Sequence, residues 1–155
     1  MDGWMHAWMH DCMDDMSEIV STRRNINRGF RKLDIWKLSI EYYKMVVEIM
    51  TKHQDIPFKI LAQVEDSALS ISSNIAEGYS RRTLKENLRF YEIALSSSAE
   101  NCSQIHALTE SEQITRNEFE LLDVKLYEIE NKIIRMNQSL IKKMNSGEKW
   151  ESDYQ

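Results

Sequence analysis

The chain has 155 residues, a length that suits one domain with a substantial core. One proline and four glycines are too few for a loop-rich or all-β protein, because turns and hairpins consume those residues. No apolar run reaches the roughly 18 residues of a membrane span, and no secretory signal pattern appears, so we expect a cytoplasmic protein without membrane contact. Cys12 and Cys102 lie far apart with no CxxC pattern, which disfavours a disulfide framework.

Residues 1–22 open with a near repeat, WMHA followed by WMHD. His6, His10, Asp11 and Cys12 have spacings that a transition metal could use, but we favour a disordered extension without a metal site. Four aspartates in the first fifteen residues supply most of the net charge of −5. The rest of the chain is therefore nearly neutral.

Residues 23–32 form a basic arm, because the stretch TRRNINRGFRK (22–32) contains no acidic residue. Asn25, Asn27 and Gly29 disfavour a continuous helix there, so we expect the arm to be extended along a surface. Its five cations are Arg23, Arg24, Arg28, Arg31 and Lys32.

The first helix is expected after Gly29, and it carries two neighbouring apolar stripes at helical spacing. The stripes are Leu33, Trp36, Ile40, Tyr43, Val47 and Met50, and Ile35, Leu38, Tyr42, Met45 and Ile49. Two stripes predict a wide buried face that touches several helices. Together with Ile93 and Ile134, which we expect to be exposed, they offer more apolar surface than one bundle hides, so the pattern predicts a homo-oligomer.

The second helix is expected over residues 58–76, with Pro57 in its first turn and Gly78 as a left-handed C-terminal cap. Its inward residues are Leu61, Val64, Ala68, Ile71 and Ile75.

Two further helices begin at capping boxes, Thr83 to Glu86 and Thr115 to Glu118. Their inner stripes are Leu84, Leu88, Tyr91, Leu95, Ser98, Cys102, Ile105 and Thr109, and Phe119, Leu122, Leu126, Ile129, Ile133, Met136 and Leu140. Short connections make neighbouring helices antiparallel. The sequence therefore predicts an all-α protein, an up-down-up-down antiparallel four-helix bundle over residues 23–145, followed by a tail at 146–155.

The second and third helices are rich in serine and alanine, which lets two backbones approach closely. Asn74, Glu77 and Glu100 lie near this seam. One interpretation makes them a buried polar network that joins the helices, with Arg81 or Arg82 neutralising a carboxylate. The other makes them half-exposed residues without a special role.

The run NIAEGYSRR (74–82), with SALSISS before it and ENLRFYEIALSSSAE after it, resembles the pattern of the 23S rRNA intervening-sequence proteins, also called four-helix-bundle proteins. RKLDIWKLSIEYY (31–43) is similar to that family's opening segment, in which a Leu-x-x-Trp pair starts the first helix. The resemblance covers roughly residues 23–143. It implies a four-helix bundle, a ring-like homopentamer, and a relation to the accessory variability proteins of diversity-generating retroelements, which bind a reverse transcriptase and its RNA.

The residue patterns of common catalytic sites do not occur. His53 and His106 lack the Glu-x-x-His spacing of di-iron bundles, and there is no HExxH, phosphate-binding glycine loop or GxSxG. Cys102 falls on an inner stripe, where a small core residue is the simplest interpretation. We therefore expect a protein that is not an enzyme, with no cofactor, no metal and no catalytic residue.

Two functional hypotheses remain open. In the first, an oligomeric module binds RNA or an RNA-processing protein such as a reverse transcriptase through the arm and a second cluster, Arg81, Arg82, Lys85 and Arg89. Tyr79, Phe90 or Tyr91 would then stack on bases. In the second, the chain is a structural or protein-interaction scaffold without affinity for nucleic acid, which a pI near 5.4 favours.

Overall fold

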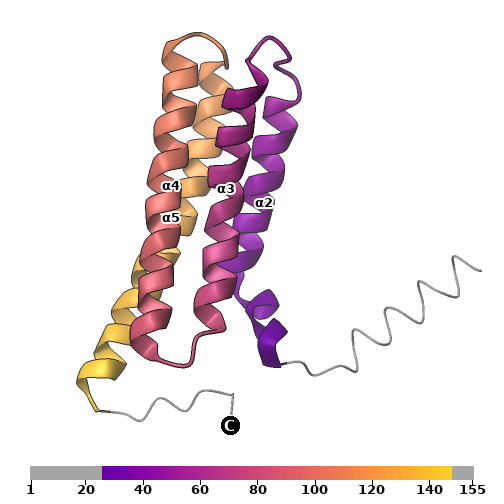
Figure 1. Ribbon diagram of the computed structural model, residues 1–155. Helices are drawn as coiled ribbons and strands as arrows, with labels where there is room; N and C mark the ends of the chain where they lie inside the picture. The colour runs from indigo at the N-terminus through magenta and orange to yellow at the C-terminus, as the bar shows by residue number, and fades with distance from the viewer. Residues whose placement is uncertain (1–25, 148–155) are drawn as a thin grey trace, which may run out of the picture.

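Four antiparallel helices form a bundle in the computed structural model, which describes residues 26–147 (Figure 1). A short 3₁₀ helix, η1 (Ile26–Lys32), precedes α2 (Asp34–Met50), α3 (Phe58–Tyr79), α4 (Leu84–Glu110) and α5 (Arg116–Asn145). Each long helix packs on the next along the chain, and α5 closes the bundle against α2. The predicted up-down-up-down bundle is confirmed. The predicted extension 1–22 and most of the tail 146–155 lie outside the described residues.

One core runs the length of the bundle, and the helical periodicity of the sequence identifies most of it. The largest fully buried side chains include Tyr42, Met50, Ile71, Ile75, Ile105, Leu122, Leu126, Ile129 and Ile133. α3 and α4 make the most extensive contact in the bundle, as their small residues predict.

Helix α2 departs from its prediction of one wide buried face. Ile35, Tyr42 and Ile49 of the second stripe are buried. The first stripe, from Leu33 to Val47, is only half-buried, and Met50 alone of that stripe is fully buried. The bundle therefore leaves a row of apolar side chains partly uncovered.

The helix ends are set by the capping residues that the sequence shows. Thr115 Oγ1 accepts a hydrogen bond from the Glu118 N–H at 3.2 Å, and the Glu118 carboxylate accepts one from the Thr115 N–H at 2.9 Å. At α4 only half of the predicted box forms: Thr83 Oγ1 accepts from the Glu86 N–H at 3.3 Å, but the Glu86 carboxylate accepts from the Thr83 hydroxyl, at 2.8 Å, and not from the Thr83 N–H. Because these donors would otherwise lack partners, both helices begin where predicted.

The prediction of Gly78 as a left-handed cap is wrong, because α3 continues through it to Tyr79. Gly78 is needed for a different reason. A Cβ atom there would lie 3.0 Å from Phe90 Cβ and 3.0 Å from Tyr91 Cε1, and 3.2 Å from the Asn87 carbonyl oxygen. The absence of a side chain at Gly78 lets α3 and α4 approach closely. Gly78 itself has an ordinary helical φ, and α3 ends one residue later.

The basic arm is not extended over residues 26–32, contrary to its prediction, because these residues form η1. η1 packs on both α2 and α3, and the Phe30 ring meets the Trp36 ring edge-on with 5.1 Å between centroids. A Cβ atom at Gly29 would overlap the end of the Tyr79 side chain, which would have to shift to make room for it. Gly29 thus lies within η1, where it packs directly against Tyr79.

Candidate functional site

The bundle collects its positive charge at one end. The antiparallel topology places η1, the start of α2, the α3–α4 turn and the end of α5 together (Figure 1). We call residues 26–38, 76–92 and 132–147 the basic end, since they contain twelve Lys and Arg but four Asp and Glu. The other described residues, 39–75 and 93–131, form the acidic end, with five Lys and Arg and thirteen Asp and Glu. The described bundle, residues 26–147, is thus neutral as a whole but strongly divided in charge along its axis.

Six of the cations that the sequence singles out are exposed at the basic end. Within the described residues none of the six makes an ion pair, so their charges are directed to solvent. They are Arg28, Arg31 and Lys32 on η1, and Arg82, Lys85 and Arg89 around the start of α4. Arg23 and Arg24 lie outside the described residues.

Arg81 differs from its neighbours, because its guanidinium is already engaged. Its Nη2 donates to Glu77 Oε1 one turn earlier, and its Cζ lies 4.3 Å from the centroid of the Phe90 ring. Arg81 thus pairs with a carboxylate, but the pair is exposed and does not belong to the buried network that was predicted. Because Glu77 of α3 balances its charge and Phe90 of α4 contacts its guanidinium, Arg81 links α3 to α4.

Sequence reasoning missed the contribution of α5. Arg135, Lys142 and Lys143 are exposed at the basic end, and Lys132 is half-buried with Nζ 3.7 Å from Glu128 Oε1. Residues 131–147 contain no acidic side chain, which is visible in the sequence. Together with the expected antiparallel topology, this observation could have predicted that the end of α5 lies at the same end of the bundle as the other two basic clusters.

The aromatic residues proposed for base stacking are mostly occupied in the fold. Tyr91 is 2% exposed, and burial raises the pKa of its hydroxyl to about 12. Phe90 holds the Arg81 guanidinium, and Tyr79 is half-buried against Gly29. Stacking by Tyr91 is therefore excluded in this fold, and the basic end presents charge with little free aromatic surface.

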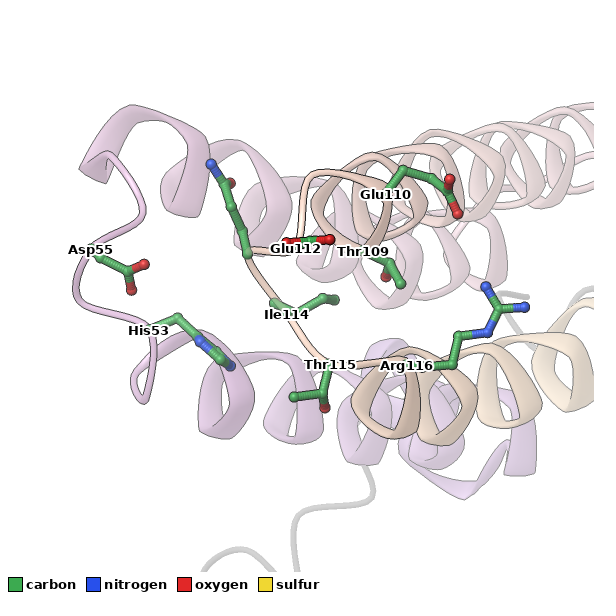
Figure 2. Close-up of a pocket in the computed structure, with 9 residues that line it drawn as sticks. His53, Asp55, Thr109, Glu110, Glu112, Ile114, Thr115 and Arg116 are labelled. Atoms are coloured by element: carbon green, nitrogen blue, oxygen red, sulfur yellow. The ribbon is translucent and has the colours of Figure 1, made fainter.

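An open pocket of about 600 Å³ lies at the acidic end, between the α2–α3 and α4–α5 loops (Figure 2). His53 and Asp55 line it from the first loop, and Glu110, Thr115 and Arg116 line it from the second. None of the site residues predicted from the sequence lines this pocket. It lies at the end of the bundle opposite to the basic end.

The fold and the sequence pattern both have counterparts among known proteins. The family model of the 23S rRNA-intervening sequence protein matches residues 31–135. The chain belongs to this family. It is similar to the crystal structure of a protein of unknown function from the S23 ribosomal protein family of Bacteroides thetaiotaomicron, with a TM-score of 0.63 and 23% identity. The likeness covers 66% of this chain and 97% of that one, and it concerns the fold. No curated protein sequence matches the chain.

Of the two interpretations of Asn74, Glu77 and Glu100, the buried polar network is wrong, and the structure agrees with the one that leaves them partly or fully exposed. Glu77 and Glu100 are exposed, and Asn74 is half-buried. Their hydrogen bonds stay within their own helices: Asn74 donates to the Ser70 carbonyl at 2.8 Å, Glu77 pairs with Arg81, and Glu100 accepts from Gln104 at 3.4 Å. None of them joins α3 to α4.

A buried polar network does cross the core, but it is centred on Asn101 of α4, one residue after Glu100. Asn101 Nδ2 donates to the Val64 carbonyl and to Ser67 Oγ, each at 2.8 Å, and its Oδ1 accepts from the Tyr42 hydroxyl. Burial raises the pKa of Tyr42 well above its usual range. Three helices thus share one satisfied polar centre, which fixes their register. The helical spacing that places Glu100 near the seam could not resolve this shift of one residue.

The thiol of Cys102 has the environment of a structural residue. It is half-buried and donates to Asp123 Oδ1 at 3.9 Å. Burial and the nearby carboxylates of Asp123 and Glu130 raise its pKa, which disfavours the nucleophilic thiolate. Within residues 26–147, no group of three or more His, Cys, Asp or Glu is placed to hold a metal, and no helix is long and apolar enough to cross a membrane.

Proposed function

We propose that this intervening-sequence family member is a non-enzymatic, self-assembling binding module whose basic end contacts RNA through phosphates. The single observation that carries the proposal is the separation of charge along the bundle. Three chain segments that are remote in sequence contribute twelve cations to one end. An ordinary solvated surface intersperses both signs, whereas a one-sided cluster creates the positive potential that attracts a polyanion.

The chemistry of the end favours contacts to the backbone of the nucleic acid. Exposed Lys and Arg pair with phosphate oxygens and release condensed counterions, which supplies affinity without reading sequence. Direct readout of single-stranded bases needs free aromatic surfaces, and the fold uses Phe90 and Tyr91 internally. We therefore expect binding that depends on salt and tolerates many sequences.

A scaffold without nucleic-acid affinity is the second candidate, and it is favoured by the exposed apolar side chains of α5, such as Val124 at 71% and Tyr127 at 66% exposure. Protein contacts through α5 are also compatible with RNA binding at the basic end, because the two surfaces are separate. A reverse transcriptase, which the family resemblance implies as a partner, would then be recruited beside the RNA.

The proposal is tested by fluorescence anisotropy with a labelled single-stranded RNA at about 0.1 M salt. The parent chain should bind, and Lys85→Ala/Arg89→Ala should bind several-fold more weakly because two phosphate contacts are lost. A matched control removes one lysine and one arginine from the acidic end, Lys52→Ala/Arg116→Ala, and should leave the affinity unchanged. No binding by the parent would reject the RNA function for the isolated protein and favour the scaffold.

A further inference from the structure

The pocket at the acidic end has hydrogen-bonding side chains that the fold does not use. Asp55 on the α2–α3 loop and Glu112 on the α4–α5 loop are exposed, and neither carboxylate makes an ion pair or a hydrogen bond to any part of residues 26–147. The half-buried Gln113 side chain also has no hydrogen-bond partner in that range. A volume of about 600 Å³ suits a small organic ligand, which these groups could bind.

The pocket has its shape before any ligand arrives, because both of its loops are anchored. Ile56 and Ile114, each 3% exposed, fix the two loops to the core. His53 Nε2 lies 3.1 Å from both carboxylate oxygens of Glu118, which ties the α2–α3 loop to the first turn of α5. A ligand that binds such a preformed site loses little free energy to the ordering of its walls.

Charges of both signs lie on the pocket wall, at separate places. Asp55 is at one side of the pocket and Arg116 at the other, with Glu112 between them (Figure 2). Arg116 Nε is 3.7 Å from Glu120 Oε1, longer than a charge-assisted hydrogen bond, so the guanidinium keeps its donors for another partner. Arg116 also lies in the first turn of α5, where the helix dipole favours an anion.

Glu112 occupies a backbone position that suits a different residue. Its φ is 58°, in the left-handed region that glycine and asparagine adopt far more readily than glutamate. Its carboxylate makes no hydrogen bond or ion pair within residues 26–147 that would offset this strain. The described fold therefore gives the charge of Glu112 no structural role, whereas a bound cation would use it.

We propose that this pocket binds a basic amino acid such as lysine, either as a free molecule or as the last residue of a polypeptide. The ammonium groups face Asp55 and Glu112, and the carboxylate faces Arg116. Free lysine has two ammonium groups and one carboxylate, which match the two unpaired carboxylates and the one guanidinium of the pocket. A metal ion does not fit, because within the described residues no group of three or more His, Cys, Asp or Glu is placed to hold one.

The charge distribution of the bundle supports a ligand with net positive charge. The acidic end has thirteen Asp and Glu but five Lys and Arg, so its potential attracts such a ligand and repels RNA. The basic end has the opposite preference. The amino acid and the RNA therefore bind at opposite ends, and the pocket does not depend on the RNA function.

An NMR titration of the backbone amides tests the site in the full chain, at about 0.15 M salt so that long-range attraction is screened. Lysine should shift the amides of residues 53–55 and 109–116, which surround the pocket. Cadaverine, the diamine that lacks the carboxylate of lysine, should bind several-fold more weakly. An N-acetylated peptide that ends in lysine identifies the source of the ligand. Tighter binding than free lysine indicates a polypeptide end, and weaker binding indicates the free amino acid.

Two variants separate the roles of the charges. Arg116→Gln should weaken lysine binding several-fold and leave cadaverine binding unchanged. Asp55→Asn/Glu112→Asn should weaken the binding of both, and its melting temperature should not fall, because asparagine tolerates the positive φ at position 112. The matched control, Asp66→Asn/Glu100→Gln, removes two exposed carboxylates outside the pocket and should bind lysine as the parent does.

Three results would overturn the proposal. One is the absence of shifts in the pocket amides at millimolar lysine. Another is equal affinity for lysine and cadaverine, which would show a general attraction of cations to the acidic end. The third is an unchanged lysine affinity in Arg116→Gln or in Asp55→Asn/Glu112→Asn. No RNA is present in the titration, so its outcome is separate from the test of the basic end.

Discussion

The Nε2 atom of His53 lies 3.1 Å from both carboxylate oxygens of Glu118, and this contact joins the loop after α2 to the first turn of α5. Glu118 also completes the capping box of α5. Burial alone would raise the pKa of Glu118, but the hydrogen bonds from Thr115 and His53 together hold this pKa below its usual value of 4.5. The Glu118 carboxylate therefore both caps α5 and ties the α2–α3 loop to it at the acidic end of the bundle.

Glu118→Gln should lower the free energy of unfolding at pH 7 by roughly 0.3–1 kcal/mol, because glutamine keeps the capping-box acceptor and only the negative charge in the first turn of α5 is lost. A depressed folded-state pKa contributes stability that is present above pH 4.5 and is lost as the pH falls through the lower folded value. The difference between parent and variant should therefore shrink between pH 5 and pH 3, as measured by urea unfolding. Glu120→Gln, on the exposed side of the same turn, should change little at any pH, and an equal loss in both variants would refute the role of Glu118.

Asn101→Ala should destabilise the bundle by about 1–3 kcal/mol, the usual cost of a buried polar group left without a partner. The substitution removes the acceptor of the buried Tyr42 hydroxyl, whereas the Val64 carbonyl keeps its hydrogen bond from Ser67 Oγ. Its neighbour provides the control: Glu100→Ala removes an exposed side chain and should stay within about 0.5 kcal/mol of the parent. Thermal or urea unfolding measures both, and similar values for the two variants would contradict the assigned network.

Gly29→Ala should loosen the packing of η1 on α3, because its Cβ atom would overlap the end of the Tyr79 side chain, which must then shift. Hydrogen exchange should then lose protection at residues 30–33, while the four long helices keep theirs. RNA affinity should also fall, since Arg28, Arg31 and Lys32 would no longer be held beside the α4 cations. Unchanged protection of η1 in the variant would show that the segment accommodates a side chain after all.

Lys142→Ala/Lys143→Ala tests the part of the basic end that sequence reasoning overlooked. If α5 contributes phosphate contacts, this pair should weaken RNA binding to a similar degree as Lys85→Ala/Arg89→Ala, with no loss of helix content by circular dichroism. An affinity equal to that of the parent would restrict the interface to η1 and the start of α4.

The fold could be predicted because its main determinants are local. Helical periodicity, two threonine caps and short loops specify four antiparallel helices, and each of these signals is readable within about one turn of the residue concerned. The errors occur where a distant contact decides the outcome. Gly78 lies against Phe90 and the Asn87 carbonyl of α4, and Gly29 lies against the end of the Tyr79 side chain. Neither glycine has a positive φ, and no local sequence pattern predicts these distant contacts.

The candidate site, too, was predictable where it depends on local sequence and not where it depends on distant contacts. The cations of residues 22–32 and 81–89 are evident in the sequence, but their union with Lys142 and Lys143 exists only after the chain has folded into an antiparallel bundle. The misplaced polar network differs from the observed one by a single residue on α4, about 100° of helical rotation. Periodicity alone cannot separate Glu100 from Asn101 at the edge of a buried face.

The salt dependence of RNA binding tests the central claim most directly. Affinity of the parent chain for a single-stranded RNA, measured by anisotropy between about 0.05 and 0.3 M salt, should fall with a log–log slope of roughly −0.7 for each phosphate contact. Lys85→Ala/Arg89→Ala should flatten that slope by roughly 1.4 units for two lost contacts, whereas Lys52→Ala/Arg116→Ala should reproduce the parent slope. Equal slopes in all three proteins would contradict the assignment of RNA binding to the basic end.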